Sequence, residues 1–131
     1  MRDLEKAREW QKRAKSNIAF AKISTISQEI LYEDLCYNAQ QAIEKALKAL
    51  CIAHEIIFPR TYDIAYLMEL LDVKGITMPV KLESARILTD YAVETRYPGD
   101  YEPVDEMDYL KAVKIAEEIV DWVKNEIDTL I

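Results

Sequence analysis

The chain has 131 residues, half of them apolar, and a net charge of −7 from 17 basic and 24 acidic side chains. This length fits a single domain, residues 1–131, which can bury a core without a metal ion or a disulfide. There is no run of eighteen uncharged apolar residues, and the charged, amphipathic N-terminal segment has no signal-peptide core. We therefore expect a cytoplasmic protein with no membrane partner.

The charge is unevenly distributed along the sequence. Residues 1–22 have a net charge of +4, whereas residues 23–131 have a net charge of −11. The acidic body argues against tight nonspecific binding of nucleic acid, because contacts to phosphates need positive charge. The basic segment could contact an acidic partner or a phosphate chain, or it could be a solvated helix face.

Only six residues are Gly or Pro, and the apolar pattern predicts helices throughout. The first helix is expected at about 3–23, where apolar residues recur at spacings of three and four. The second is expected at about Gln28–His54 and carries a wide apolar stripe and a separate polar one. Five residues share the polar stripe by their helical spacing: Asp34, Asn38, Gln41, Lys45 and Lys48.

The rest of the chain predicts three more helices. Pro59 ends the second helix, and Thr61 is expected to cap a short third helix that stops at a left-handed Gly75. The fourth is expected at about Pro79–Tyr97 and the fifth at about Asp105–Leu130, with Asp105 as its N-cap. Because the connections are short, we predict an all-α fold, an antiparallel up-and-down bundle of four long helices plus one short helix.

The cysteines and the single histidine give no metal site. Cys36 and Cys51 lie about 22 Å apart along one predicted helix, so they cannot bridge each other and are expected to be reduced core thiols. No Cys or His pair has metal-ligand spacing, and no metal or cofactor is expected. His54 is expected to cap helix carbonyls or to face solvent, with a catalytic role near Arg96 as the alternative.

The stretch ETRYPGDYEPV, residues 94–104, interrupts the helical pattern. Pro98 ends the fourth helix, and Gly99 permits a sharp reversal. Arg96 could complement the negative end of the helix dipole while the neighbouring tyrosines pack over the end of the bundle. Alternatively, Arg96 offers a planar guanidinium to a phosphate, and Tyr97 and Tyr101 stack or form hydrogen bonds.

Three segments together resemble the HEPN domain, the nucleotide-binding domain of higher eukaryotes and prokaryotes. They are CYNAQQAIEKALKAL at 36–50, RTYDIAYLMELL at 60–71 and YAVETRYPGDY at 91–101. The resemblance covers nearly the whole chain. It implies a helical bundle that is usually a homodimer, and a minimal nucleotidyltransferase as a frequent partner in two-component or toxin–antitoxin systems.

Many HEPN domains are metal-independent ribonucleases with an Arg-x4–6-His motif, in which the arginine handles the phosphate and the histidine transfers protons. Arg96 stands in the arginine position, but no histidine follows it in this sequence. Tyr101 stands five residues on, and a free tyrosine has a pKa near 10, poorly matched to general-base work near neutral pH. Tyr62 stands where the family often has a histidine. Arg96 and Tyr101 are the catalytic candidates of an incomplete motif.

The resemblance and the polar stripe together give five candidate residues for binding a nucleotide or phosphate: Arg96, Tyr97, Asn38, Gln41 and Lys45. Asn38 and Gln41 could read base edges while Lys45 neutralises a phosphate. The stripe could instead be a wet face or an interface across a symmetric dimer. Three functions follow: a homodimeric HEPN-type accessory domain that binds nucleotide or nucleic-acid phosphate and pairs with a nucleotidyltransferase, a HEPN-type ribonuclease, or a plain helical interaction module.

Overall fold

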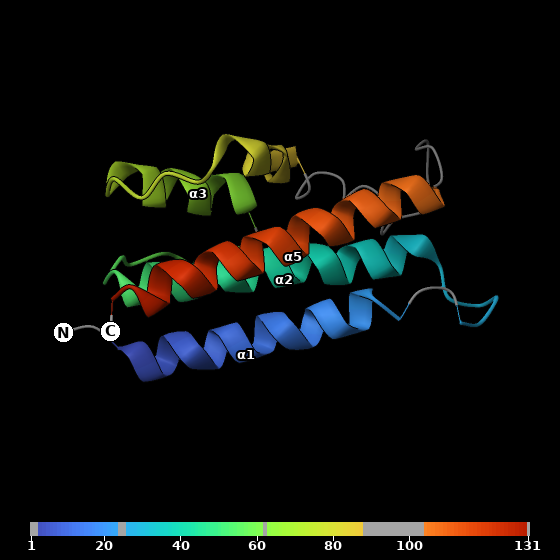
Figure 1. Cartoon of the computed structure of the whole chain (residues 1–131), viewed down its shortest axis with the longest axis horizontal. Coiled ribbons are helices and arrows are strands. Elements are labelled where there is room, and N and C mark those ends of the chain that lie inside the picture. The colour runs from blue at the N-terminus through green and yellow to red at the C-terminus, as the bar shows by residue number, and fades with distance from the viewer. Residues whose placement is uncertain (1–2, 24–25, 62, 88–103, 131) are drawn as a thin grey trace.

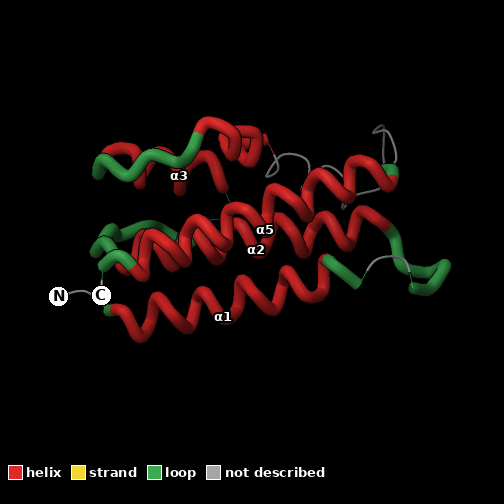
Figure 2. The backbone as a smooth tube through the Cα atoms, in the orientation of Figure 1, coloured by secondary structure: helices red, strands yellow, loops and turns green. Residues whose placement is uncertain are grey.

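The computed structural model describes residues 3–23, 26–61, 63–87 and 104–130. Its elements are α1 (Leu4–Ala21), α2 (Tyr32–Ala53), α3 (Ile64–Val73), η1 (Val80–Ile87) and α5 (Glu106–Asp128). Helices joined by loops and turns make up all of the described chain (Figure 2), and the predicted all-α bundle is confirmed. Within the described ranges, no helix combines the length and apolar character that crossing a membrane requires.

The three long helices α1, α2 and α5 lie side by side along the long axis, with α3 and η1 covering one side of them (Figure 1). Ion pairs show that α1 and α5 are antiparallel, because Arg8 pairs with Asp128 at one end and Lys22 pairs with Glu117 towards the other. α1 is also antiparallel to α2, so α2 and α5 run in the same direction. In the sequence α3 and η1 lie between α2 and α5, and η1 packs against both α3 and α5.

Alanines line the contact between α1 and α2. Ala7, Ala14 and Ala21 recur at every seventh residue of α1 and are fully buried. A matching row on α2 is equally buried: Ala39, Ala42, Ala46, Ala49 and Ala53. Small side chains let two helix backbones approach closely, which explains why this pair makes the most extensive helix–helix contact in the bundle.

Aspartate side chains cap the N-termini of three helices, and Asp3 caps α1 by accepting the N–H of Lys6 at 2.9 Å. Asp105 precedes α5 and forms a capping box with Asp108, since each side chain accepts the other residue's backbone N–H. The predicted N-cap of α5 is therefore confirmed. The cap of α3 is Asp63, whose carboxylate accepts the N–H of Tyr66 at 3.2 Å. The prediction that Thr61 caps this helix is wrong, because its hydroxyl accepts the N–H of Asp63 instead.

Left-handed residues end α2 and α3. Gly75 has φ +82°, and the N–H of Ile76 reaches back to the carbonyl of the last turn of α3 at 3.0 Å, as predicted for that glycine. Glu55 occupies the same position after α2 with φ +60°, and the N–H of Ile56 donates to the carbonyl of Cys51 at 2.8 Å. This turn stops α2 before Pro59, so the proline is not the residue that ends it.

The second helix begins later than the sequence suggests. Its first residue is Tyr32, not a residue near Gln28. The Ser27 hydroxyl accepts the N–H of Glu29 at 3.2 Å, and the Ser27 carbonyl accepts the N–H of Ile30 at 3.1 Å. These bonds close a local turn, which competes with helix formation at this point.

The predicted fourth helix is described only over its first part. There it forms η1, a 3₁₀ helix, instead of an α-helix. Arg86 fastens this segment to α3, because its guanidinium donates to Asp72 at 3.2 Å and to the Ala65 carbonyl at 3.4 Å, and a 2.6 Å bond to Glu83 within η1 orients it. The remainder of the predicted helix, residues 88–97, lies outside the described residues.

Candidate functional site

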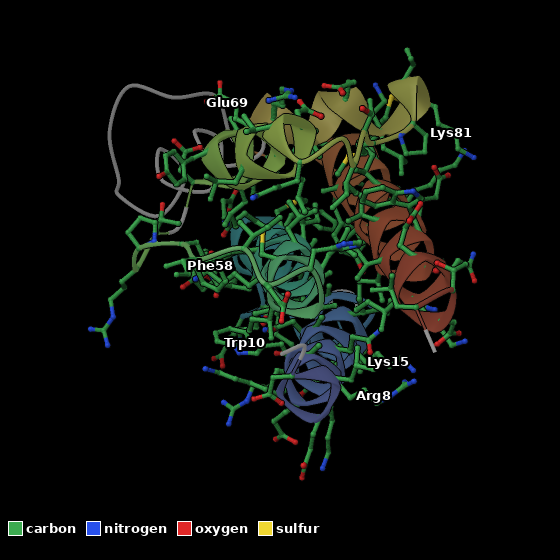
Figure 3. All side chains as sticks on the ribbon, turned by 90° about the vertical axis from the view of Figure 1, so that its left-hand side faces the viewer. Arg8, Trp10, Lys15, Phe58, Glu69 and Lys81 are labelled. Atoms are coloured by element: carbon green, nitrogen blue, oxygen red, sulfur yellow. The ribbon has the colours of Figure 1, made fainter. Side chains whose placement is uncertain are left out.

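Three predicted site residues lie on one face of α2, beside α1. Asn38, Gln41 and Lys45 are all half-buried and follow one another at spacings of three and four. Figure 3 looks along the helices and shows the two sides of the α1–α2 pair. Trp10 and Phe58 lie on the side away from α5, whereas Arg8 and Lys15 lie on the side of α5. The three α2 residues together with Asn17 of α1 are called the α1–α2 polar face below.

The other predicted site residues are not part of the described structure. Arg96, Tyr97 and Tyr101 fall within residues 88–103. The described chain resumes at Val104, whose N–H donates to Glu33 Oε1 of α2 at 2.9 Å. That Arg96 shares a cleft with the amides of α2 therefore stays a prediction.

Asn17 joins the two helices of the polar face. Lys45 Nζ donates to Asn17 Oδ1 at 2.8 Å, and Asn17 Nδ2 donates to Asn38 Oδ1 at 3.1 Å. Asn38 Nδ2 then donates to the carbonyl of Asp34 at 3.2 Å. Because a lysine ammonium can only donate, it fixes the orientation of the Asn17 amide, which in turn fixes that of Asn38.

The Lys45 ammonium is partly buried and has charges of both signs near it. Burial is the main cause that lowers the pKa of Lys45 below its ordinary value; the Glu44 carboxylate opposes this, and the charges of Arg13 and Lys48 add to it. In the described part of the chain, Lys45 bonds to an amide and forms no ion pair with a carboxylate. The polar face thus offers positive charge and N–H groups, although the chain as a whole is acidic.

A buried carboxylate organises the neighbouring side chains. Glu44 is 3% exposed and accepts from Lys48 Nζ at 2.8 Å and from the amide nitrogens of Gln40 and Gln41 at 3.4 Å each. Gln41 Nε2 also donates to Gln40 Oε1 at 3.2 Å. Because a carboxylate can only accept, both glutamines must turn their NH₂ groups towards it.

Lys48 of α2 contacts both α1 and the segment that follows α2. Its side chain is 7% exposed, and its ammonium lies 5.5 Å from the ring centre of Trp10 in α1 and 5.9 Å from that of Phe58 after α2. Cation–π attraction at such distances adds to the ion pair with Glu44. The buried charge therefore holds α1 and the segment after α2 against the helix that carries it.

Asn17 and the ion pair of Glu44 with Lys48 were not predicted from the sequence. Asn17 lies seven residues after Trp10, hence on the same side of α1, which is a weak signal. The ion pair has a clearer one, because Glu44 precedes Lys48 by four residues inside an otherwise apolar run. Neither signal shows that these side chains are buried, since burial depends on what packs over them.

His54 and the cysteines have structural positions. The His54 backbone N–H donates to the carbonyls of Leu50 and Cys51, so His54 is the C-cap residue of α2, while the role expected of its side chain stays a prediction. Cys36 and Cys51 are both buried, and burial raises the pKa of each thiol to about 12. Within the described ranges, no group of three or more His, Cys, Asp or Glu could hold a metal ion.

The chain is similar to a known protein family, to a named protein and to a solved crystal structure. A sequence model of the HEPN domain matches residues 7–126, a range that contains the whole α1–α2 polar face. A Methanocaldococcus jannaschii protein named "Putative toxin MJ1304" is 30% identical over 131 residues, covering 87% of this chain and 83% of that protein. The crystal structure of TT1696 from Thermus thermophilus superposes with a TM-score of 0.74 at 27% identity, covering 91% of this chain and 96% of that one.

Proposed function

The chain belongs to the HEPN domain family, and from this premise we propose that it is a toxin-like HEPN protein that binds the phosphate of a nucleotide or nucleic acid at its α1–α2 polar face. It acts as a homodimer and pairs with a minimal nucleotidyltransferase in a toxin–antitoxin-like system. The printed name of the M. jannaschii relative supports the toxin-like role. The partner and the dimer follow from what the family resemblance implies.

The observation that carries the phosphate site is the position of Lys45. Its ammonium donates to an amide oxygen at 2.8 Å, and the Glu44 carboxylate, its strongest charged neighbour, is already paired with Lys48 at 2.8 Å. Lysines on protein surfaces commonly pair with carboxylates, which would compete with a phosphate. Here the described partner is neutral, so the charge is available to an anion, and partial burial strengthens the attraction.

Arg96 supplies the second cation of this proposed site. A guanidinium binds two phosphate oxygens at once, which a lysine cannot do. Tyr97 stacks against the base or sugar, and Tyr101 forms a hydrogen bond to the ligand. Val104, the first described residue after this segment, donates its N–H to Glu33 near the start of α2.

Fluorescence anisotropy with a labelled single-stranded RNA and calorimetry with nucleoside monophosphates test the proposal. Lys45→Gln should weaken binding about ten-fold or more, because a hydrogen bond to a charged group contributes about 1.5–3 kcal/mol. The matched control is Lys114→Gln, which removes the same charge from an exposed position of α5 and should leave the affinity nearly unchanged. Equal affinities for wild type and Lys45→Gln, or equal losses in both variants, would contradict phosphate binding at this face.

The dimer and the partner need separate measurements. Sedimentation equilibrium should give twice the chain mass of 15.2 kDa. Co-expression with a minimal nucleotidyltransferase from the same genome should yield a complex that survives gel filtration. A strictly monomeric protein that co-purifies with no nucleotidyltransferase would remove this part of the proposal.

A further inference from the structure

We infer that Gln41 is the specificity-determining residue of the α1–α2 polar face, where its side-chain carbonyl accepts a hydroxyl that neighbours the bound phosphate. The face would then prefer a phosphate ester with a free hydroxyl on the adjacent carbon over bare phosphate or a deoxy analogue. This inference rests on the proposed binding of phosphate at Lys45. It follows from the direction in which each hydrogen bond of the face runs.

One hydrogen-bond chain makes the Lys45 side of the face a set of donors. It starts at the Lys45 ammonium, passes through Asn17 and Asn38, and ends on a main-chain carbonyl. The carbonyl oxygens of both asparagine side chains are used inside this chain. What remains to meet a ligand are N–H groups of all three residues, which suit an acceptor such as a phosphate oxygen.

A second chain of opposite polarity leaves Gln41 with an acceptor. The buried Glu44 carboxylate and the Gln40 carbonyl oxygen both take hydrogen bonds from Gln41 Nε2. Gln41 therefore turns its NH₂ group inward, and in the described chain its Oε1 accepts no hydrogen bond. The face thus presents one carbonyl oxygen beside a group of donors.

The spacing of these groups defines the ligand. Gln41 precedes Lys45 by four residues and follows Asn38 by three, so each pair lies about 5–6 Å apart between Cβ atoms. A bare phosphate would fill the donor side only and bring its charge close to the Gln41 oxygen. A phosphate ester with an adjacent hydroxyl places acceptors on the donors and a donor on Gln41 Oε1. A ribonucleoside 3′-phosphate has this arrangement, either as a free nucleotide or within an RNA strand.

A matched ligand pair tests the inference without any variant. Calorimetric or NMR titration of the wild-type protein with adenosine 3′-monophosphate and 2′-deoxyadenosine 3′-monophosphate should give an affinity about five-fold higher for the first, the effect of one neutral hydrogen bond. Gln41→Met should remove the preference while leaving the affinity for the deoxy compound within about two-fold. The control is Gln11→Met, which replaces a buried glutamine of α1 outside these two chains and should keep the preference.

The outcomes separate this inference from the proposed function. If both compounds bind equally to the wild type and Lys45→Gln weakens both, phosphate binding stands and the role of Gln41 is overturned. If neither compound binds, both are overturned. Hexamers of RNA and DNA with one sequence identify the source of the ligand: a preference repeated on the hexamers supports an RNA strand, and one confined to the mononucleotides supports a free nucleotide.

Discussion

The buried ion pair of α2 gives the sharpest prediction for stability. Lys48→Met leaves the Glu44 carboxylate buried without its cation, and Glu44→Gln leaves the Lys48 ammonium buried without its anion. Both side chains are less than a tenth exposed, and the two charged atoms are 2.8 Å apart. Removing one partner of a buried pair costs about 3–5 kcal/mol, because the remaining charge stays out of water.

The loss of stability should differ between Lys48→Met and Glu44→Gln, because different groups surround the charge that remains. After Lys48→Met, the carboxylate keeps two amide donors at 3.4 Å, which are long bonds and compensate little, so we expect a loss of about 3–4 kcal/mol. After Glu44→Gln, the ammonium still lies between the rings of Trp10 and Phe58, which offset about 1 kcal/mol, so the loss should be about 2–3 kcal/mol. The double variant buries no charge and should be more stable than Lys48→Met alone.

Urea unfolding followed by circular dichroism gives these free energies, provided that the four proteins unfold with similar urea dependence. The matched control is the pair of Lys124 and Asp128 on α5, which has the same spacing and a 2.9 Å contact but lies in solvent. Lys124→Met should change stability little, since exposed pairs contribute little. If the double variant were less stable than both single variants, the reasoning about uncompensated charge would be refuted.

Two further predictions concern the thiols and a helix cap. Cys36 and Cys51 keep their protons up to about pH 12 in the folded protein, whereas an unfolded thiol loses its proton near 9.0, so stability should be unaffected below pH 9 and fall above it. Replacing both by Ala should flatten the pH dependence of urea unfolding above pH 9, and unchanged slopes would contradict the thiol assignment. Asp105→Ala should cost about 1 kcal/mol in thermal unfolding, whereas Asp105→Asn, which retains the cap, should cost much less; similar losses in both would show that the cap is not the cause.

Local backbone chemistry explains which fold predictions succeed. Gly75 and Asp105 act through their own φ angle or their own nearest N–H groups, so the sequence around them is sufficient. Thr61 and Asp63 are both competent caps, and the path of the chain into α3 selects the second. Glu55 shows the limit most clearly, because a left-handed glutamate has no sequence signature and is held by the turn that follows it.

The polar face of α2 was predictable from helical spacing, but its hydrogen-bond network was not. Helical spacing alone places Asn38, Gln41 and Lys45 together, and in the structure they share one side of α2. The direction of their hydrogen bonds depends on Asn17 from another helix and on the burial of Glu44, which are properties of packing. The part played by Arg96 stays a prediction for the same reason, since it depends on where that residue lies relative to α2.

The alanine rows between α1 and α2 bear on recognition by the face beside them. Asn17 belongs to one helix and Lys45 to the other, so the distance between the two backbones sets whether their bond can form. Close packing at Ala14 and its neighbours holds that distance constant, and a ligand would meet groups that are already preorganised, with little conformational freedom left to lose. Under the proposed function, affinity at this surface would depend on alanine methyl groups that do not touch the ligand. A bulkier side chain between the two helices would shift one helix along the other and weaken the proposed binding.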